Sequence, residues 1–222
     1  EARNTGIRKA RGSMIFFVDS DCKMYPNNIE YALSDFQEDQ IDAVCGQEVA
    51  TSTKTIIDKY RAHLPQSWGS RKIINPPFLW GLCSAFKKDS LLKVGLFSSM
   101  FRTNGEDVDI SLQMKKMGCR LLYDPQIKVR HLRTDNIVSF LKSTYHANYF
   151  GKLAYIKNST QADRNQRIIK AFANEVKVRL ITPIIKSDAS WIERVCFGII
   201  GNLCFVISKI ATFNARRGLG VP

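Results

Sequence analysis

Hydrophobic side chains along this chain gather in short runs of strand length, separated by longer segments with helical spacing. The run M-I-F-F-V at 14–18 is apolar throughout, which is typical of a strand buried on both faces. Similar runs predict four more strands, at 41–49, 78–86, 119–123 and 127–131. Pro and Gly interrupt the pattern between 51 and 78, where we expect a helix followed by a loop.

The segments between these strands have the spacing and the end signals of helices. We expect helices at 2–10, over about ten residues after Pro26, at 90–94 and at 106–117. The last of these has acidic residues at its start, Lys115 and Lys116 near its end and Gly118 after it, in agreement with the helix macrodipole. Strands that alternate with helices predict an α/β fold, with a mostly parallel sheet flanked by helices.

The pattern changes after His131, and residues 134–186 are basic and helical in spacing. Residues 195–208 are then almost wholly apolar, and the apolar stretch continues to residue 213. A membrane span needs about 20 apolar residues, so its length is marginal. Basic side chains flank or interrupt the stretch as interface anchors would: Arg194, Lys209, Arg216 and Arg217. We expect a membrane-embedded or interfacial helix, with a core helix as the alternative.

The chain is strongly basic, with 33 Lys and Arg against 20 Asp and Glu and a net charge of +13. This charge favours contact with nucleic acid, anionic lipid or phosphorylated small molecules. The excess lies largely after residue 114, beside the apolar C-terminal stretch, which suits an anionic membrane better than a nucleic acid. We therefore expect no nucleic-acid partner, although a basic nucleic-acid-binding protein stays a rival interpretation. The expected domains are 1–133 and a helical, basic, membrane-associated region at 134–222.

Six cysteines are spread along the chain without a C-x-x-C pair or a finger-type His partner: Cys22, Cys45, Cys83, Cys119, Cys196 and Cys204. Several lie in apolar runs, which is typical of free buried thiols in a reducing compartment. A disulfide framework is the alternative.

The first candidate site follows the strand at 14–18, where the apolar run ends in Asp19-Ser20-Asp21. Ligands of open α/β sheets bind at the carboxyl ends of the strands, and two carboxylates one residue apart can face one hard cation. Mg²⁺ or Mn²⁺ would accept these oxygens and keep substrate phosphates as further ligands. A surface turn rich in Asp is the alternative interpretation.

The second candidate site is N-G-E-D-V-D-I at 104–110, where Glu106 and Asp107 begin a helix. Acidic residues at this position can simply cap the helix. Capping does not explain the preceding Gly105, nor the presence of His131 at the end of a later strand. A lone His is usually structural, but a His beside two carboxylates can be a third metal ligand.

Four segments in order carry a resemblance to family 2 glycosyltransferases. They are A-R-N-T-G, the D-x-D turn, W-G-L-C-S-A-F-K-K-D-S-L-L-K-V-G-L-F at 80–97, and G-E-D-V-D-I-S-L-Q-M-K-K-M-G-C-R-L-L-Y-D-P at 105–125 with its closing His. Order and spacing resemble the family over residues 2–131. The resemblance implies a GT-A fold and an inverting transfer of sugar from a nucleotide-sugar to a hydroxyl acceptor.

The resemblance also implies a role for each candidate metal ligand. Asp21 would bind a divalent ion on the diphosphate directly, and Asp19 would help to hold the metal or the nucleotide ribose. His131 matches a third ligand found in some members. The ion, Mn²⁺ or Mg²⁺, would stabilise charge on the departing nucleoside diphosphate.

The remaining roles concern the sugar and the acceptor. Asp107 matches the catalytic base, which takes a proton from the acceptor hydroxyl, and Glu106 would contact the acceptor or the donor sugar. Trp80 and Gly81 match a loop near the sugar, while Arg3 and Asn4 match a motif that lines the nucleotide. A helix N-terminus lowers the pKa of a carboxylate and desolvation raises it, so the basicity of Asp107 stays open at this point.

The chain departs from the family pattern in one respect, since family members have about 70 to 90 residues of nucleotide-binding strands and helix before the A-R-N segment. We therefore expect an N-terminally truncated domain, and the predicted function is that of the parent protein. A catalytically inert remnant that binds a membrane or a partner is one rival. Another is a nucleotidyltransferase, for which the sequence has no Gly-rich, Lys-bearing phosphate loop.

The basic C-terminal region extends the prediction to partners and location. It suggests a lipid-linked acceptor or a product that enters cell-surface polysaccharide, at the cytoplasmic face of a membrane, with peripheral or single-span attachment. The donor is expected to be a UDP-, GDP- or dTDP-sugar.

Overall fold

The computed structural model describes residues 1–38, 40–49, 54–64, 67–101, 103–158, 177–185 and 189–218. The chain divides into two compact units: unit 1 is residues 1–50 and 66–132, and unit 2 is residues 51–65 and 133–222. Residues 159–176 and 186 of the expected basic helical segment lie outside the described residues. The domain boundary after residue 133 stays a prediction, and residues 51–65, which it placed in the first domain, are grouped with unit 2.

Unit 1 is built around a mixed six-stranded sheet with the order β1-β5-β3-β6-β2, in which β4 also pairs with β6. The strands are β1 (Met14–Val18), β2 (Cys22–Met24), β3 (Ala43–Val49), β4 (Ile73–Ile74), β5 (Cys83–Lys87) and β6 (Leu121–His131). The predicted α/β class is confirmed. The two strands expected at 119–123 and 127–131 form the single strand β6, and β2 and β4 were not expected.

The expectation of a mostly parallel sheet is wrong for the described strands. Only β3 and β6 pair in parallel. Strand β5 runs antiparallel to β1 and β3, while β2 and β4 run antiparallel to β6. A parallel pair needs a crossover that packs on the sheet. The helix between β3 and β5, α3 (Ile56–Ala62), belongs to unit 2 instead, and the chain re-enters the sheet in the opposite direction.

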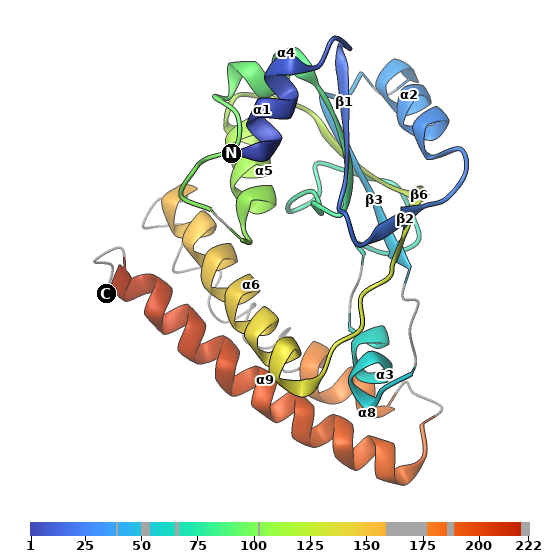
Figure 1. Ribbon diagram of the computed structural model, residues 1–222, viewed down its shortest axis with the longest axis vertical. Helices are drawn as coiled ribbons and strands as arrows, with labels where there is room; N and C mark the ends of the chain where they lie inside the picture. The colour runs from blue at the N-terminus through green and yellow to red at the C-terminus, as the bar shows by residue number, and fades with distance from the viewer. Residues whose placement is uncertain are drawn as a thin grey trace. The chain divides into compact units, whose positions relative to one another are not determined.

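Helices cover both faces of this sheet (Figure 1): α1 (Ala2–Lys9), α4 (Lys88–Lys93) and α5 (Glu106–Lys116) lie on one face, and α2 (Asn28–Glu38) lies on the other. The strands alternate between the two resulting cores, as the period of two requires. In β3, Cys45 packs with Ile110 on the α5 side, and Val44 packs with Phe36 on the α2 side. Both cores therefore position the loops that follow the strands.

A bulge between β3 and β6 depends on Gly46. The register of this pair shifts between Cys45 and Gln47. A Cβ atom at Gly46 would lie 2.3 Å from the carbonyl oxygen of Ile127, a distance that no side chain tolerates. The bulge re-aims the ends of both strands, where Glu48 and His131 lie.

Unit 2 is helical, with α3, α6 (Ile137–Asn158), a short π-helix (Lys177–Ile181), α8 (Thr182–Ile185) and α9 (Trp191–Gly218). Its core joins Tyr60 of α3 to Phe140 of α6 and Phe197 of α9. Helices α6 and α9 pack side by side in the same direction (Figure 1). Near their starts Phe140 and Phe197 share one core, and further along Ser208 of α9 donates a hydrogen bond to Asn148 of α6. All six cysteines are free thiols, as expected from the sequence.

Candidate active site

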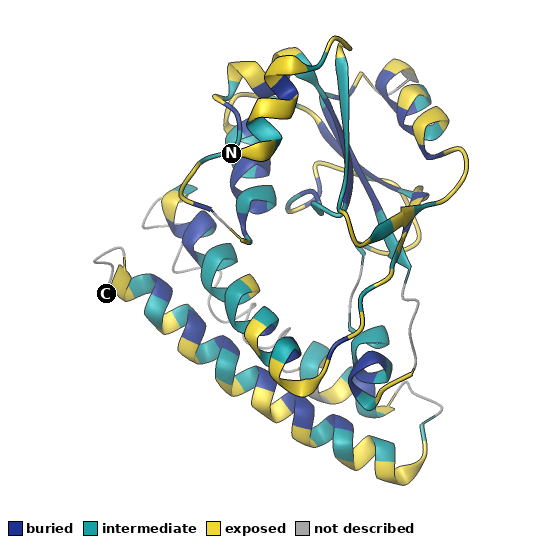
Figure 2. Cartoon of the chain, viewed as in Figure 1, coloured by how far each residue is buried: buried dark blue, intermediate teal, exposed yellow. Residues whose placement is uncertain are grey.

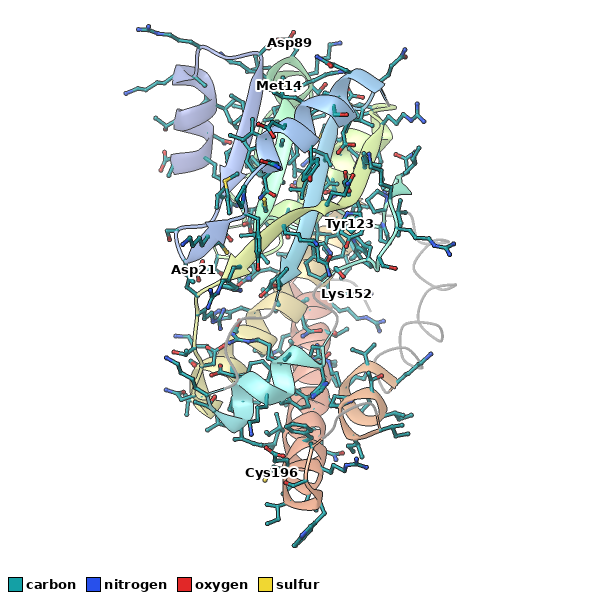
Figure 3. All side chains as sticks on the ribbon, turned by 90° about the vertical axis from the view of Figure 1, so that its right-hand side faces the viewer. Met14, Asp21, Asp89, Tyr123, Lys152 and Cys196 are labelled. Atoms are coloured by element: carbon teal, nitrogen blue, oxygen red, sulfur yellow. The ribbon has the colours of Figure 1, made fainter. Side chains whose placement is uncertain are left out.

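The D-x-D turn connects β1 to β2 at the edge of unit 1. The amide of Asp19 donates to the carbonyl of Leu82 (3.2 Å), and the amide of Cys22 donates to the carbonyl of Asp19 (3.0 Å). The carbonyl of Asp21 accepts from the amide of Leu132 at 2.8 Å. Figure 3 shows Asp21 on this turn, at the opposite end of β1 from Met14. The turn is thus fixed by backbone hydrogen bonds, and the two carboxylates are left to other partners.

Asp21 and His131 come together at this edge, where Cys22 and His131 are paired residues of β2 and β6. Nε2 of His131 lies 3.0 Å from Oδ2 of Asp21, and Nδ1 lies 2.7 Å from Oε1 of Glu48. Asp21 is half exposed, whereas His131 and Glu48 are 13% and 11% exposed at the side chain. The imidazole is therefore held between one exposed and one sheltered carboxylate.

Glu48 is a site residue that sequence reasoning missed. It lies near the carboxyl end of β3, next to the strand that carries His131. A carboxylate on one imidazole nitrogen fixes the tautomer and leaves the other nitrogen for a metal. The available signal was a polar pair, Gln47-Glu48, at the end of an apolar strand.

The electrostatics around His131 favour its charged form in this geometry. Burial lowers the pKa of His131, but the hydrogen bonds and negative charges of Glu48 and Asp21 outweigh burial, so the pKa is raised overall. A cation that replaced the proton would meet the same two carboxylates. The surroundings are thus suited to positive charge.

The donor set at this edge fits a divalent cation. Ligand atoms of Asp21, Cys22 and His131 lie within 4.8 Å of one another. Burial raises the pKa of the Cys22 thiol to about 12, so it stays protonated near neutral pH and is a weak ligand. A carboxylate oxygen and an imidazole nitrogen are the ligands that Mn²⁺ or Mg²⁺ would find here.

Asp19 has a different partner, Arg3 of α1. Nη2 of Arg3 lies 3.0 Å from Oδ1 of Asp19, and Nη1 donates to Oε1 of Glu106. Burial raises the pKa of Asp19, and the Arg3 guanidinium partly offsets this effect. Arg3 therefore connects the D-x-D turn to the start of α5. Asn4, the next residue of α1, exchanges two hydrogen bonds with the backbone of Phe97 (2.8 and 3.0 Å), which anchors the helix.

Asp107 sits in the first turn of α5, directly after Gly105-Glu106. Gly105 has a φ of +83°, a conformation that glycine adopts without strain. Oδ1 of Asp107 accepts from the amide of Val108 (2.8 Å), and Oδ2 accepts from the amide of Gly81 (3.2 Å). A Cβ at Gly81 would lie 3.3 Å from Cβ of Asp107, so a glycine at 81 permits this approach.

The sequence did not decide whether the pKa of Asp107 is raised or lowered, and the surroundings of this side chain in the structure raise it. Burial raises the pKa of Asp107 to about 6, and the negative charge of Glu106 adds to this effect. The amides of Val108 and Gly81 and the charge of Arg3 lower the pKa by less. Asp107 is therefore ionised at neutral pH and more basic than an ordinary aspartate, as a general base requires.

Trp80 and Glu106 offer polar atoms beside Asp107. Nε1 of Trp80 and Oε2 of Glu106 are buried without a hydrogen-bond partner among the described residues. The Trp80 ring lies against Trp68 and Phe78, at centroid distances of 5.4 and 4.9 Å. A donor and an acceptor left unpaired in this way are costly unless a ligand or water satisfies them.

A small cavity of about 10 Å³ borders this region. Arg3, Gly81 and Asp107 line it, together with apolar walls that include Phe86 and Phe97. Its size is close to that of one water molecule. The cavity can therefore accommodate one hydroxyl group or one water molecule beside Asp107.

The first part of the chain is similar to a known protein family. Residues 1–97 match the family described as Glycosyl transferase family 2. The matched segment includes the D-x-D turn and Gly81 and ends before Glu106, Asp107 and His131. No curated protein matches the chain.

Two solved structures are similar to this chain. A mannosyltransferase from Pyrobaculum calidifontis, in complex with GDP-Man and Mn²⁺, has a TM-score of 0.54 and 15% identity, and the match covers 95% of this chain and 65% of that protein. GalNAc-T7 with UDP, GalNAc and Mn²⁺ has a TM-score of 0.48 and 14% identity, over 69% of this chain and 33% of that one. The first match shows a shared fold, and this chain spans 65% of the length of that mannosyltransferase.

Proposed function

We propose that the protein transfers a hexose from a nucleotide-sugar to an acceptor hydroxyl, with inversion and with a divalent metal, as the match of residues 1–97 to glycosyl transferase family 2 supports. The GT-A-like fold supports a reaction of this class.

The environment of Asp107 is the observation that carries the proposal. Its carboxylate is held by two backbone amides and has a pKa of about 6, raised by burial. In the proposed reaction it takes the proton from the acceptor hydroxyl while the oxygen attacks the anomeric carbon from the face opposite the leaving diphosphate. The bond to the acceptor oxygen forms as the bond to the diphosphate oxygen breaks, which inverts the anomeric centre.

Asp21 and His131 would hold the divalent cation, with Glu48 orienting the imidazole. When bound, Mn²⁺ or Mg²⁺ supplies electrostatic stabilisation of the departing nucleoside diphosphate. Asp19 and Arg3 would line the nucleotide beside it, a role in which Arg3 is available to phosphate oxygens as well as to carboxylates. Asn4 supports this arrangement by anchoring α1 to Phe97.

The donor or acceptor sugar would lie near Trp80, Gly81 and Glu106. The unpaired Nε1 of Trp80 and Oε2 of Glu106 are a donor and an acceptor of the kind that sugar hydroxyls satisfy. Gly81 keeps the approach to Asp107 open. Losing these polar contacts should weaken sugar binding more than nucleotide binding.

Donor, acceptor and location complete the proposal. The donor is a UDP-, GDP- or dTDP-sugar, and the acceptor is lipid-linked or part of a cell-surface polysaccharide at the cytoplasmic face of a membrane. The charge of +13 and the long apolar helix α9 support contact with a membrane surface. We take a nucleic acid not to be a partner, because the basic excess lies beside this apolar helix.

Calorimetric titration of the purified chain with UDP and GDP, in the presence and absence of Mn²⁺, tests the proposal. We expect one nucleoside diphosphate to bind only with Mn²⁺, and Asp21→Asn and His131→Ala to abolish this binding. Asp107→Asn should bind the nucleotide normally and fail in transfer. GDP-Man is included as a donor because the similar mannosyltransferase was solved with it. Metal-independent binding that survives in both ligand variants would contradict the proposed site.

A further inference from the structure

Helix α9 has a second apolar face that the described part of unit 2 leaves exposed. One face packs against α6, through buried residues that include Phe197, Cys204 and Ala211. On another face, seven large apolar side chains follow one another at intervals of three or four residues, each between 43% and 58% exposed: Ile192, Val195, Ile199, Leu203, Val206, Ile210 and Phe213. We call these seven residues the α9 stripe.

The stripe is straight and long. Its spacing follows the period of about 3.6 residues per turn, so the seven side chains lie along one side of the helix for about 32 Å. Figure 2 shows buried and exposed positions recurring along the whole length of α9. Soluble monomers rarely leave an apolar surface of this extent uncovered, which indicates that a partner or a membrane covers it.

The charge around the stripe favours an anionic occupant. Residues 133–222 contain 14 Lys and Arg against 5 Asp and Glu. On α9, Lys209 lies over the Phe205 ring and Arg217 over the Phe213 ring, with exposed Arg194 near the start of the helix. Two copies that met through their stripes would bring these like charges together, whereas an anionic lipid surface would attract them.

The packing of α9 argues against a helix that crosses the bilayer. One third of the most apolar stretch of 18 residues in α9 is buried inside the structure. Ser208 and Asn214 of α9 form hydrogen bonds with Asn148 and Tyr145 of α6 at 3.0 Å each. Helix α6 carries Lys142, Lys152 and Lys157, and among the described helices only α9 is apolar enough to span. If α9 crossed the bilayer, it would either lose its contacts with α6 or bring these lysines into the hydrocarbon layer.

We infer that α9 lies in the plane of an anionic membrane surface, with its stripe in the acyl boundary and its opposite face still packed on α6. Trp191, 74% exposed at the start of the helix, is suited to the headgroup level. The basic side chains of α9 would extend to the lipid phosphates. This inference deepens the membrane part of the proposed function, and it does not depend on sugar transfer.

Flotation of the full chain with sealed vesicles, without donor or metal, tests the inference. We expect binding to vesicles of phosphatidylcholine with 30% phosphatidylglycerol, at least tenfold weaker binding to phosphatidylcholine alone, and loss of binding as NaCl increases. The pair Ile199→Ser and Ile210→Ser should lower the partition coefficient more than tenfold. Circular dichroism checks that this variant keeps its helices.

The matched control replaces two apolar residues of unit 1 whose exposure is similar to that of Ile199 and Ile210. Ile29 and Leu92 are 56% and 46% exposed on α2 and α4. The pair Ile29→Ser and Leu92→Ser should leave the partition coefficient within twofold of the wild type. Equal loss of binding in both pairs would overturn the assignment to the stripe.

A peptide tag after Pro222 distinguishes an in-plane helix from a spanning one. Protease added outside sealed vesicles should remove the tag from the bound protein, because both ends of α9 stay on one side. Protection of the tag would overturn the in-plane inference. Absence of vesicle binding, with a dimer in light scattering that the stripe pair converts to a monomer, would assign the stripe to a second copy instead. Because no nucleotide is used, failure here leaves the metal-dependent binding test of the proposed function intact.

Discussion

The carboxylates of the candidate site are distinguished by their partners. Asp21 faces the imidazole of His131, Asp19 faces the guanidinium of Arg3, and Asp107 faces two backbone amides. The sequence suggested that Asp19 and Asp21 act as a pair. Their side chains instead have separate neighbours, and we therefore propose that Asp21 binds the metal and that Asp19 contacts the nucleotide.

Asp107 gives a prediction with a pH dependence. Asp107→Asn should lower kcat/KM for transfer by about 10²- to 10⁴-fold, because the amide cannot take the acceptor proton. For the wild type, kcat/KM should be constant above the pKa of about 6 and fall about tenfold per pH unit below it, as Asp107 becomes protonated. Rates measured from pH 4.5 to 8 check this.

Asp89 provides the control for that experiment, since it is an exposed aspartate in the first turn of α4. Asp89→Asn should keep the wild-type rate and pH profile. A wild-type profile that stays flat down to pH 4.5 would show that Asp107 is not the base.

Glu48 gives a second prediction at this scale. Glu48→Gln should weaken Mn²⁺ binding by about 10- to 100-fold, because the carboxylate that orients His131 and supports its basicity is replaced by a neutral amide. The pKa of His131 should fall in the variant, since Glu48 is a main cause of its increase. Calorimetry measures the metal affinity, and NMR titration of the imidazole signals measures the pKa.

Unchanged Mn²⁺ affinity in Glu48→Gln would leave Glu48 without a positioning role.

At the scale of elements, the site is assembled at the ends of strands from different parts of the chain. Strand β1 supplies the D-x-D turn, β3 supplies Glu48 and β6 supplies His131. The bulge at Gly46 sets the register of β3 against β6 beyond Cys45. A substitution at the bulge should therefore lower the free energy of unfolding and disturb the contact between Glu48 and His131.

Gly46→Ala tests the bulge. The added methyl group would meet backbone and side-chain atoms of Ile127 at 2.3 to 2.8 Å, so the strands must separate. We expect a decrease of about 1–3 kcal/mol in the free energy of unfolding, measured by urea denaturation. Gly6→Ala is the control: it lies in α1 with no atom within 4 Å of the new Cβ, and it should stabilise by about 0.4–1 kcal/mol. Equal stabilities for the two variants would contradict the packing at the bulge.

At the scale of the whole molecule, the chain combines a GT-A-like unit with a basic helical unit. It passes from one unit to the other at both ends of residues 51–65 and again after residue 132. Unit 2 includes α3, which comes from the first third of the sequence. Ile57 and Tyr60 of α3 are 5% and 0% exposed, in the core with α6 and α9. The net charge is unevenly distributed along the chain. Acidic and basic residues are equal in number up to residue 114, and the entire net charge of +13 comes from the residues after it.

Truncation after residue 132 should therefore yield an aggregation-prone protein. It removes the partners of α3 and leaves Ile57 and Tyr60 in water. We expect increased dye binding and a lower soluble fraction than for the full chain. The same truncation with Ile57→Ser and Tyr60→Ser should recover solubility. A soluble, monomeric 1–132 without these substitutions would show that α3 does not need the remaining helices of unit 2.

Features that depend on neighbours in the chain could be predicted from the sequence. The strand at 14–18, the helix at 106–117 with its Gly105 and the long apolar helix near the C-terminus all follow from periodicity and end signals over a few residues. The order of the motifs also indicated the GT-A fold and the glycosyl transferase family whose model matches residues 1–97. The candidate residues at the ends of the strands were found in the same way.

Features that depend on pairing between distant segments followed from the three-dimensional fold. It set the antiparallel direction of β5, brought Glu48 to His131 across 83 positions, and joined Arg3 to Glu106 across 103. It also raised the pKa of Asp107, where burial outweighs the hydrogen bonds from the amides of Val108 and Gly81. The physical reason is that strand register and desolvation arise from atoms far apart in the chain, whereas hydrophobic period and capping are local.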